Sequence, residues 1–169
     1  AAAVVTVVTD VLEVELDGGA MTRADLLAYP ASNEPDSDPV RLFSSAPGDY
    51  FVAQSGWVSN DGAAPTHEAA WQLDRAALPA GADFRLDEGE QQLVVPFVWT
   101  GPDGLVIRRS FLFERGQYVV QVRDEVVNGG TQPWQGFVYR QLARVPRALE
   151  SKGPMSPEGY SFQGAAWYS

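Results

Sequence analysis

The only histidine of the chain, His67, is the first residue to test for chemistry, because histidine is the usual proton acceptor or donor near neutral pH. It lies in the polar stretch 64–68, which also carries a proline and a glutamate. A single imidazole excludes every mechanism that needs two, including a metal site with two histidine ligands. We therefore expect His67 to have a structural role or to face solvent.

Carboxylates form two local groups. Asp36 and Asp38 have the spacing of calcium ligands, but their loop lacks the central glycine and the distal glutamate of a calcium-binding loop. Asp87, Glu88 and Glu90 could act as acid and base across a sugar, as in glycoside hydrolases, although neighbours on one turn rarely face one site. We expect a solvated loop at the first group and a charged turn that keeps a sheet edge soluble at the second.

Nucleophiles are equally scarce in this sequence. The segment Gln54-Ser55-Gly56 lacks the first glycine of a nucleophile elbow and has no obvious base nearby in the sequence. Cysteine is absent, which excludes a disulfide framework, a thiolate metal site and a cysteine nucleophile. The sequence therefore assigns no catalytic residue and no metal ligand, and we expect no cofactor.

The tryptophans are candidates for ligand contact, since they could line a groove that takes an extended apolar or sugar ligand. Trp99 belongs to the apolar alternation of a predicted strand, which places it in the core. Trp57 and Trp134 lie next to turns and, together with Tyr139, are the candidate groove or contact aromatics. The full set is Trp57, Trp71, Trp99, Trp134 and Trp167.

Three β-rich runs between residues 93 and 128 must form the scaffold for these side chains. Apolar residues recur at every second position, which is the period of a half-buried strand. Turn residues at 101–104 and 115–116 separate the runs and predict antiparallel neighbours. Arg109 interrupts the apolar set of the middle run. The alternating residues are Val95, Phe97 and Trp99, then Leu105, Ile107, Phe111 and Phe113, then Tyr118, Val120, Val122 and Val126.

Short β candidates fill the rest of the chain. The segment 5–16 reads as one strand with a bulge near Asp10, and 74–78 forms at most one helical turn. Many short strands with frequent turns favour an antiparallel, all-β sandwich or barrel over an α/β fold. The further predicted strands are 22–30, 40–43, 50–54, 71–73 and 134–145.

The length and net charge of the chain limit the number of domains and the kinds of partner to expect. The 169 residues fit one domain, and the net charge of −10 with only 12 Lys and Arg argues against a nucleic-acid partner. No apolar run approaches the roughly 18 residues that a membrane-spanning helix needs, and no signal peptide is recognisable. We expect residues 1–3, three alanines, to be a linker remnant outside the fold.

A series of motifs in fixed order gives the chain a family resemblance. The strongest block is Phe111-x-Phe113-x-Arg115-Gly116-x-Tyr118-x-Val120-x-Val122. The others are Thr9-Asp10-Val11-Leu12, Gly18-Gly19, Leu26-Leu27, Tyr29-Pro30, Tyr50 with Gln54-Ser55-Gly56, Val95-Pro96 with Thr100 and Gly104, Val127-Asn128, Gln141-Leu142, and Phe162-x-Gly164-Ala165-Ala166. Together they resemble the large periplasmic domain of the Gram-negative YidC insertases, in the YidC/Oxa/Alb family.

The resemblance implies a fold and a role. The fold is a twisted β-supersandwich similar to galactose mutarotases, with residues 4–169 as a periplasmic β-sandwich domain that is part of a larger sandwich. The role is that of a non-enzymatic accessory domain of an inner-membrane insertase and chaperone, contacting the Sec translocon or client membrane proteins. Insertion itself belongs to membrane-spanning helices elsewhere in such proteins, and those parts would anchor the domain to the inner membrane.

A sugar-active domain, either carbohydrate-binding or aldose-epimerase-like, is the alternative. The mutarotase-like fold implied by the resemblance and the many tryptophans favour it. The single histidine weighs against an epimerase, because ring opening by proton transfer near neutral pH requires a tuned acid and base around the sugar.

Overall fold

The chain folds almost entirely into antiparallel strands, which confirms the predicted all-β class. The computed structural model describes residues 3–60 and 62–145. Within them lie strands β1 (Val5–Val8), β2 (Leu12–Leu16), β3 (Ala20–Pro30), β4 (Pro39–Phe43), β5 (Phe51–Val58), β6 (Gln72–Leu73), β7 (Gln92–Thr100), β8 (Leu105–Glu114), β9 (Gln121–Asn128) and β10 (Phe137–Arg144), with short 3-10 helices η1 (Arg75–Ala77) and η2 (Pro102–Gly104).

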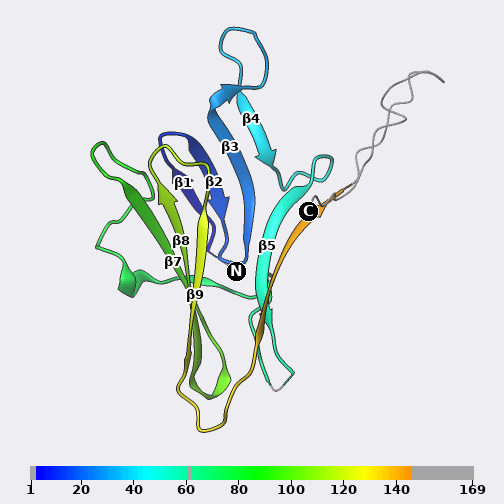
Figure 1. Cartoon of the computed structure of the whole chain (residues 1–169), viewed down its shortest axis with the longest axis vertical. Helices are drawn as coiled ribbons and strands as arrows, with labels where there is room; N and C mark the ends of the chain where they lie inside the picture. The colour runs from blue at the N-terminus through cyan, green and yellow to red at the C-terminus, as the bar shows by residue number, and fades with distance from the viewer. Residues whose placement is uncertain (1–2, 61, 146–169) are drawn as a thin grey trace, which may run out of the picture.

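The strands form two sheets that pack against each other as a sandwich (Figure 1). We call them sheet A, in the order β1-β2-β3-β5-β10 with β4 also paired to β3, and sheet B, in the order β6-β7-β8-β9. The three runs predicted between residues 93 and 128 form β7, β8 and β9 of sheet B, each antiparallel to the next. The consecutive-strand prediction is therefore confirmed.

The core lies between β1, β2 and β3 of sheet A and β7 and β8 of sheet B. Inward side chains alternate along each strand with outward ones, as the two-residue period requires. Trp71, just before β6, is fully buried in this core. The buried cluster comprises Val5, Val7, Leu12, Val14, Leu16, Ala24, Trp71, Val95, Phe97, Ile107, Phe111 and Phe113.

Several predicted strands have different limits in the structure. The segment 5–16 is a hairpin and not one bulged strand, because the Thr9 hydroxyl accepts the backbone N–H groups of Val11 and Leu12 and closes a turn. The third run begins at Gln121, since residues 117–120 still belong to the connection after β8. These two errors arise where apolar alternation continues through a turn. The strand predicted at 50–54 extends to Val58 as β5, and the strand predicted at 134–145 begins only at Phe137 as β10.

A buried ion pair of sheet B lies against sheet A. Arg109, the residue that interrupts the apolar set of β8, has a fully buried side chain and donates to both carboxylate oxygens of Asp124 on β9 at 2.7 Å. Its remaining nitrogen donates to the carbonyls of Gly18 and Ser55, both in sheet A or its turns, at 3.1 and 2.8 Å. The guanidinium also lies 4.6 Å from the centre of the Trp71 ring. Arg109 thus joins β8 to β9 through Asp124 and fixes sheet B on sheet A through the two carbonyls.

A second ionic cluster lies on the outer face of sheet A. The buried Asp25 carboxylate on β3 accepts hydrogen bonds from Arg41 at 2.7 and 3.0 Å and from Arg23 at 2.8 Å. Arg23 also reaches Glu13 and Glu15 on β2. Burial by itself would raise the pKa of Asp25, but the hydrogen bonds from the two arginines outweigh it and hold that pKa below its ordinary 3.8.

The ion pair between the sheets gives a first stability prediction. Replacing Asp124 with asparagine leaves the Arg109 guanidinium buried without a counter-charge, which should cost about 3–5 kcal/mol of unfolding free energy. The matched control is Glu125→Gln, which makes the same change at the exposed neighbouring position and should cost under about 0.5 kcal/mol. Urea unfolding followed by tryptophan fluorescence measures both. Equal losses in the two variants would contradict the role of Asp124.

The Asp25 cluster predicts a pH dependence. Because the folded pKa lies below the unfolded one, the ionised carboxylate stabilises the fold above pH 3.8, and this contribution disappears as the pH falls through the folded pKa. The difference in unfolding free energy between the natural protein and Asp25→Asn should therefore be largest near neutral pH and shrink below pH 3.8. Asp49→Asn, at an exposed turn, is the control and should show no such convergence. A constant difference across this range would contradict the prediction.

Candidate functional site

The three candidate contact aromatics lie on one neighbourhood of the fold. Trp57 is on β5, Tyr139 is on β10, and Trp134 precedes β10 in the connection from β9. The register of the two strands places Trp57 opposite Val138 and Tyr139 opposite Gly56. The structure thus brings Trp57 and Trp134 together from distant parts of the sequence, whereas Tyr139 lies on the opposite face of the same pair of strands. Whether they contact a ligand or a partner stays a prediction.

Trp57 and Trp134 pack on each other, with ring centres 5.8 Å apart. The indole N–H of Trp57 donates to Asp124 at 2.9 Å, so this ring is attached to the ion pair between the sheets. The indole N–H of Trp134 donates to the carbonyl of Ala63 at 3.2 Å. Both polar groups are used inside the protein, which leaves the ring faces and edges as the part of each tryptophan available for contact.

Tyr139 binds the only histidine of the chain. Its hydroxyl accepts the backbone N–H of His67 at 2.9 Å and lies 2.6 Å from the Nδ1 atom of the same residue. The half-buried His67 side chain is therefore a fixed part of the segment between β5 and β6, in agreement with the structural role expected for it. A Cβ atom at Gly56 would collide with the backbone of residues 66 and 67, so glycine lets this segment approach β5.

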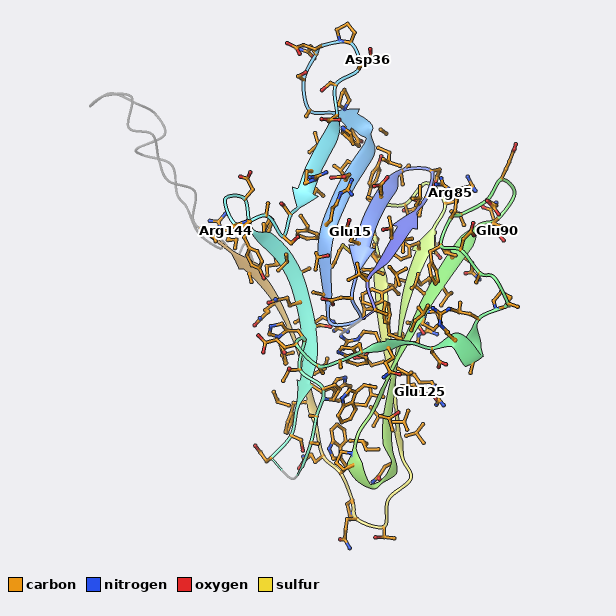
Figure 2. All side chains as sticks on the ribbon, turned by 180° about the vertical axis from the view of Figure 1, so that it is seen from behind. Glu15, Asp36, Arg85, Glu90, Glu125 and Arg144 are labelled. Carbon is orange, nitrogen blue, oxygen red and sulfur yellow. The ribbon has the colours of Figure 1, made fainter. Side chains whose placement is uncertain are left out.

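The carboxylates singled out in the sequence lie elsewhere. Asp36 and Asp38 are exposed in the loop between β3 and β4, with Asp36 at its tip (Figure 2). Asp87, Glu88 and Glu90 form an exposed turn before β7, and Arg115 donates to the backbone carbonyls of the first and last of them. Neither group lies with the three aromatic residues Trp57, Trp134 and Tyr139, which we call the aromatic cluster.

Metal ligands and nucleophiles do not converge in the described part of the chain. No three His, Cys, Asp or Glu side chains of residues 3–60 and 62–145 are grouped so that they could hold a metal ion. The carbonyl of Ser55 accepts a hydrogen bond from the buried Arg109, which makes this stretch of β5 part of the junction between the sheets.

An apolar groove is the feature that sequence reasoning missed. It opens between β3, β5 and β10 on one side and β8 with residues 118–122 on the other, and has a volume of about 450 Å³. Phe43, Phe111, Val122 and Leu142 are among its lining residues. The residue that could have indicated this groove in the sequence is Leu142, an apolar residue between Gln141 and Ala143. Its significance depends on the pairing of β10 with β5, which the sequence does not specify.

The contact between Tyr139 and His67 predicts an asymmetry between two variants. Tyr139→Phe leaves a backbone N–H and a ring nitrogen without their shared partner and should cost about 1–3 kcal/mol of unfolding free energy. His67→Ala keeps the backbone hydrogen bond and should cost less. Urea unfolding of the two variants measures the difference, and an equal or reversed order would show that the backbone bond does not anchor the segment.

Comparison with known proteins shows which protein family the chain matches. A family model described as the YidC periplasmic domain matches residues 4–169. The chain is 44% identical over 169 residues to a protein named membrane protein insertase YidC from Xanthomonas euvesicatoria pv. vesicatoria, covering 100% of this chain and 28% of the relative. It is 39% identical over 167 residues to the protein of the same name from Xylella fastidiosa, covering 98% of this chain and 29% of the relative.

The chain therefore spans less than a third of the length of these relatives. None of the helices in residues 3–60 and 62–145 is long and apolar enough to cross a membrane. The matched family describes a periplasmic domain, and both the matched residues and the two-sheet fold agree with it. The chain belongs to the YidC periplasmic domain family.

Proposed function

We propose that this periplasmic domain is an accessory interaction module of a membrane protein insertase and chaperone, and that it contacts the Sec translocon or client segments. Family membership motivates the insertase setting, since the relatives carry that name. The observation that carries the contact role is the aromatic cluster, which is fixed by internal hydrogen bonds next to exposed apolar side chains.

The proposed contact surface lies where β5 and β10 begin to separate from the rest of the sandwich. Val58 and Phe137 are cross-strand partners and are 48% and 53% exposed. Tyr139 follows Phe137 by two residues, so the two side chains leave the same face of the strand. Trp57 and Trp134 support this end of β5 and β10 from the inner side. Rigid aromatic and aliphatic groups of this kind lose little side-chain entropy when a partner binds.

The domain acts through binding and not through catalysis in this proposal. His67 and Tyr139 are engaged with each other, and the acidic turn at 87–90 lies apart from them. The sugar-active alternative gains no support, because the matched family and the named relatives are described as insertases or their periplasmic domain. Residues 4–169 form the domain unit in this proposal, with residues 1–3 as a linker remnant.

A charge placed on the proposed surface tests it. In the full-length parent protein, Val58→Glu with Phe137→Glu should weaken contact about tenfold, the effect of losing roughly 1.4 kcal/mol of binding free energy. A photoreactive amino acid at position 135, in the exposed connection before β10, reports the contact by cross-linking in membranes. The control is Val94→Glu, at a 41% exposed position of β7 in the other sheet, which should leave cross-linking unchanged.

The identity of the cross-linked product separates the two partner classes. A Sec translocon component favours a docking role, and a nascent membrane protein favours a client-binding role. Cross-linking that persists in the double variant, or that yields neither partner, would contradict the proposed surface.

A further inference from the structure

The groove of about 450 Å³ lies between the inner faces of the two sheets. Sheet A contributes residues of β3, β4, β5 and β10, and sheet B contributes Phe111 of β8 and Val122 of β9. Figure 1 shows β5 and β10 diverging from β9 toward the end of β10. Val58, Phe137 and the aromatic cluster are not among its described lining residues, so the groove is separate from the contact surface proposed above.

The lining of the groove is mainly apolar. Aliphatic and aromatic side chains come from both sheets and from the connection after β8. Two polar side chains of the lining, Gln54 and Gln141, are hydrogen-bonded to each other at 2.7 Å. A ligand in this groove therefore meets hydrocarbon over most of its length. The apolar lining residues include Met21, Phe43, Phe111, Val120, Val122 and Leu142.

Arg140 is the one charged residue among the described residues that line the groove. Val138, two residues earlier on β10, is the cross-strand partner of Trp57. Trp57 points toward sheet B, where its indole N–H donates to Asp124. Val138, Arg140 and Leu142 therefore share the inward face of β10. A chain with a net charge of −10 thus places a cation, and no anion, in its apolar groove.

This combination selects an anion that carries a hydrocarbon chain. A guanidinium can donate two parallel hydrogen bonds to one carboxylate, and no carboxylate of residues 3–60 and 62–145 forms an ion pair with Arg140. If a methylene group fills as much space as a water molecule in the liquid, roughly 30 Å³, the groove holds about 15 of them. That is a single chain of fatty-acid length and not the two chains of a phospholipid.

An extended peptide fits the groove less well than an acyl chain does. Each buried peptide unit brings an N–H and a C=O that require partners. The strands β5 and β8 beneath the groove each lie between two paired strands, so their backbone groups are used in the ladders. Gln54 and Gln141 are used by each other. A hydrocarbon chain has no such requirement, because its head group is its only polar part.

We propose that the groove binds a fatty-acid anion, with its chain along Met21, Phe111 and Leu142 and its carboxylate on Arg140. This site goes beyond the contact role proposed above, because its ligand is a small amphiphile and not a protein. Binding removes apolar surface of both the chain and the groove from water. The pairing of the carboxylate with Arg140 fixes the direction in which the chain lies.

Photolabelling of the full-length parent tests the proposal. The protein is reconstituted in phosphatidylcholine vesicles together with palmitate that carries a diazirine in its chain, and mass spectrometry locates the labelled peptides. We expect label in the peptides that contain Met21, Phe111 and Leu142. Label found only outside this chain, or spread evenly over it, would overturn the proposal.

The role of Arg140 is tested with a second probe, hexadecanol that carries the same diazirine. At equal probe content of the vesicles, the natural protein should be labelled about tenfold more by the carboxylate than by the alcohol. Arg140→Gln should lose this preference. The control Arg123→Gln removes a cation from the outward face of β9 and should keep it. A preference that survives Arg140→Gln, or that both variants lose, would overturn the assignment of the carboxylate to Arg140.

A block of the groove and a label from inside it complete the test. Leu142→Glu places a carboxylate beside Arg140 and should abolish labelling by palmitate, while the urea midpoint stays close to that of the natural protein because Leu142 is 65% exposed. Unchanged labelling would contradict the site. A photoreactive amino acid at position 142 then captures the occupant in cells. An adduct of fatty-acid mass supports the proposal, and a cross-link to a polypeptide overturns it.

Discussion

The requirement to neutralise one buried cation organises this domain. A guanidinium buried between two sheets is stable only if every N–H finds an acceptor and the charge finds a counter-ion. Arg109 has its counter-ion in Asp124 on the neighbouring strand and donates two further hydrogen bonds to carbonyls of sheet A and its turns. These contacts hold only in one register of β8 on β9 and in one position of the sheets. The ion pair thus fixes the register of β8 on β9 and the position of one sheet on the other. Apolar packing alone would let the strands slide more easily.

The same ion pair connects the core to the candidate surface. Asp124 accepts the indole N–H of Trp57 in addition to the arginine, and Trp57 packs on Trp134. Tyr139, on the strand paired with that of Trp57, fixes the segment around His67. The aromatic cluster is therefore held in place by contacts that lead to the ion pair at the centre of the sandwich. In a module that works by contact, such rigidity reduces the entropy lost on binding, and it explains why polar atoms that seem available in the sequence are engaged inside the fold.

The core, the charged groups and the exposed apolar groups occupy different parts of the sandwich. The side formed by β1, β2, β7 and β8 carries the core. The ionic cluster around Asp25 covers part of the outer face of sheet A, on β2, β3 and β4. Exposed apolar residues occur on several strands, among them Val126 and Val127 on β9 and Phe137, Val138 and Leu142 on β10.

The sequence by itself determined the strand class, the antiparallel run from β7 to β9 and the family, because apolar alternation and turn residues are local signals and the motif series is linear. It also marked Arg109 as an exception on an apolar face. Only the tertiary structure decided what that exception does, since Asp124, Gly18 and Ser55 meet it through pairings that depend on the whole fold. The sequence did not predict the hairpin at Thr9 or the groove beside Leu142 for the same reason. A turn closed by one hydroxyl and a gap between non-adjacent strands produce no periodic pattern of residues.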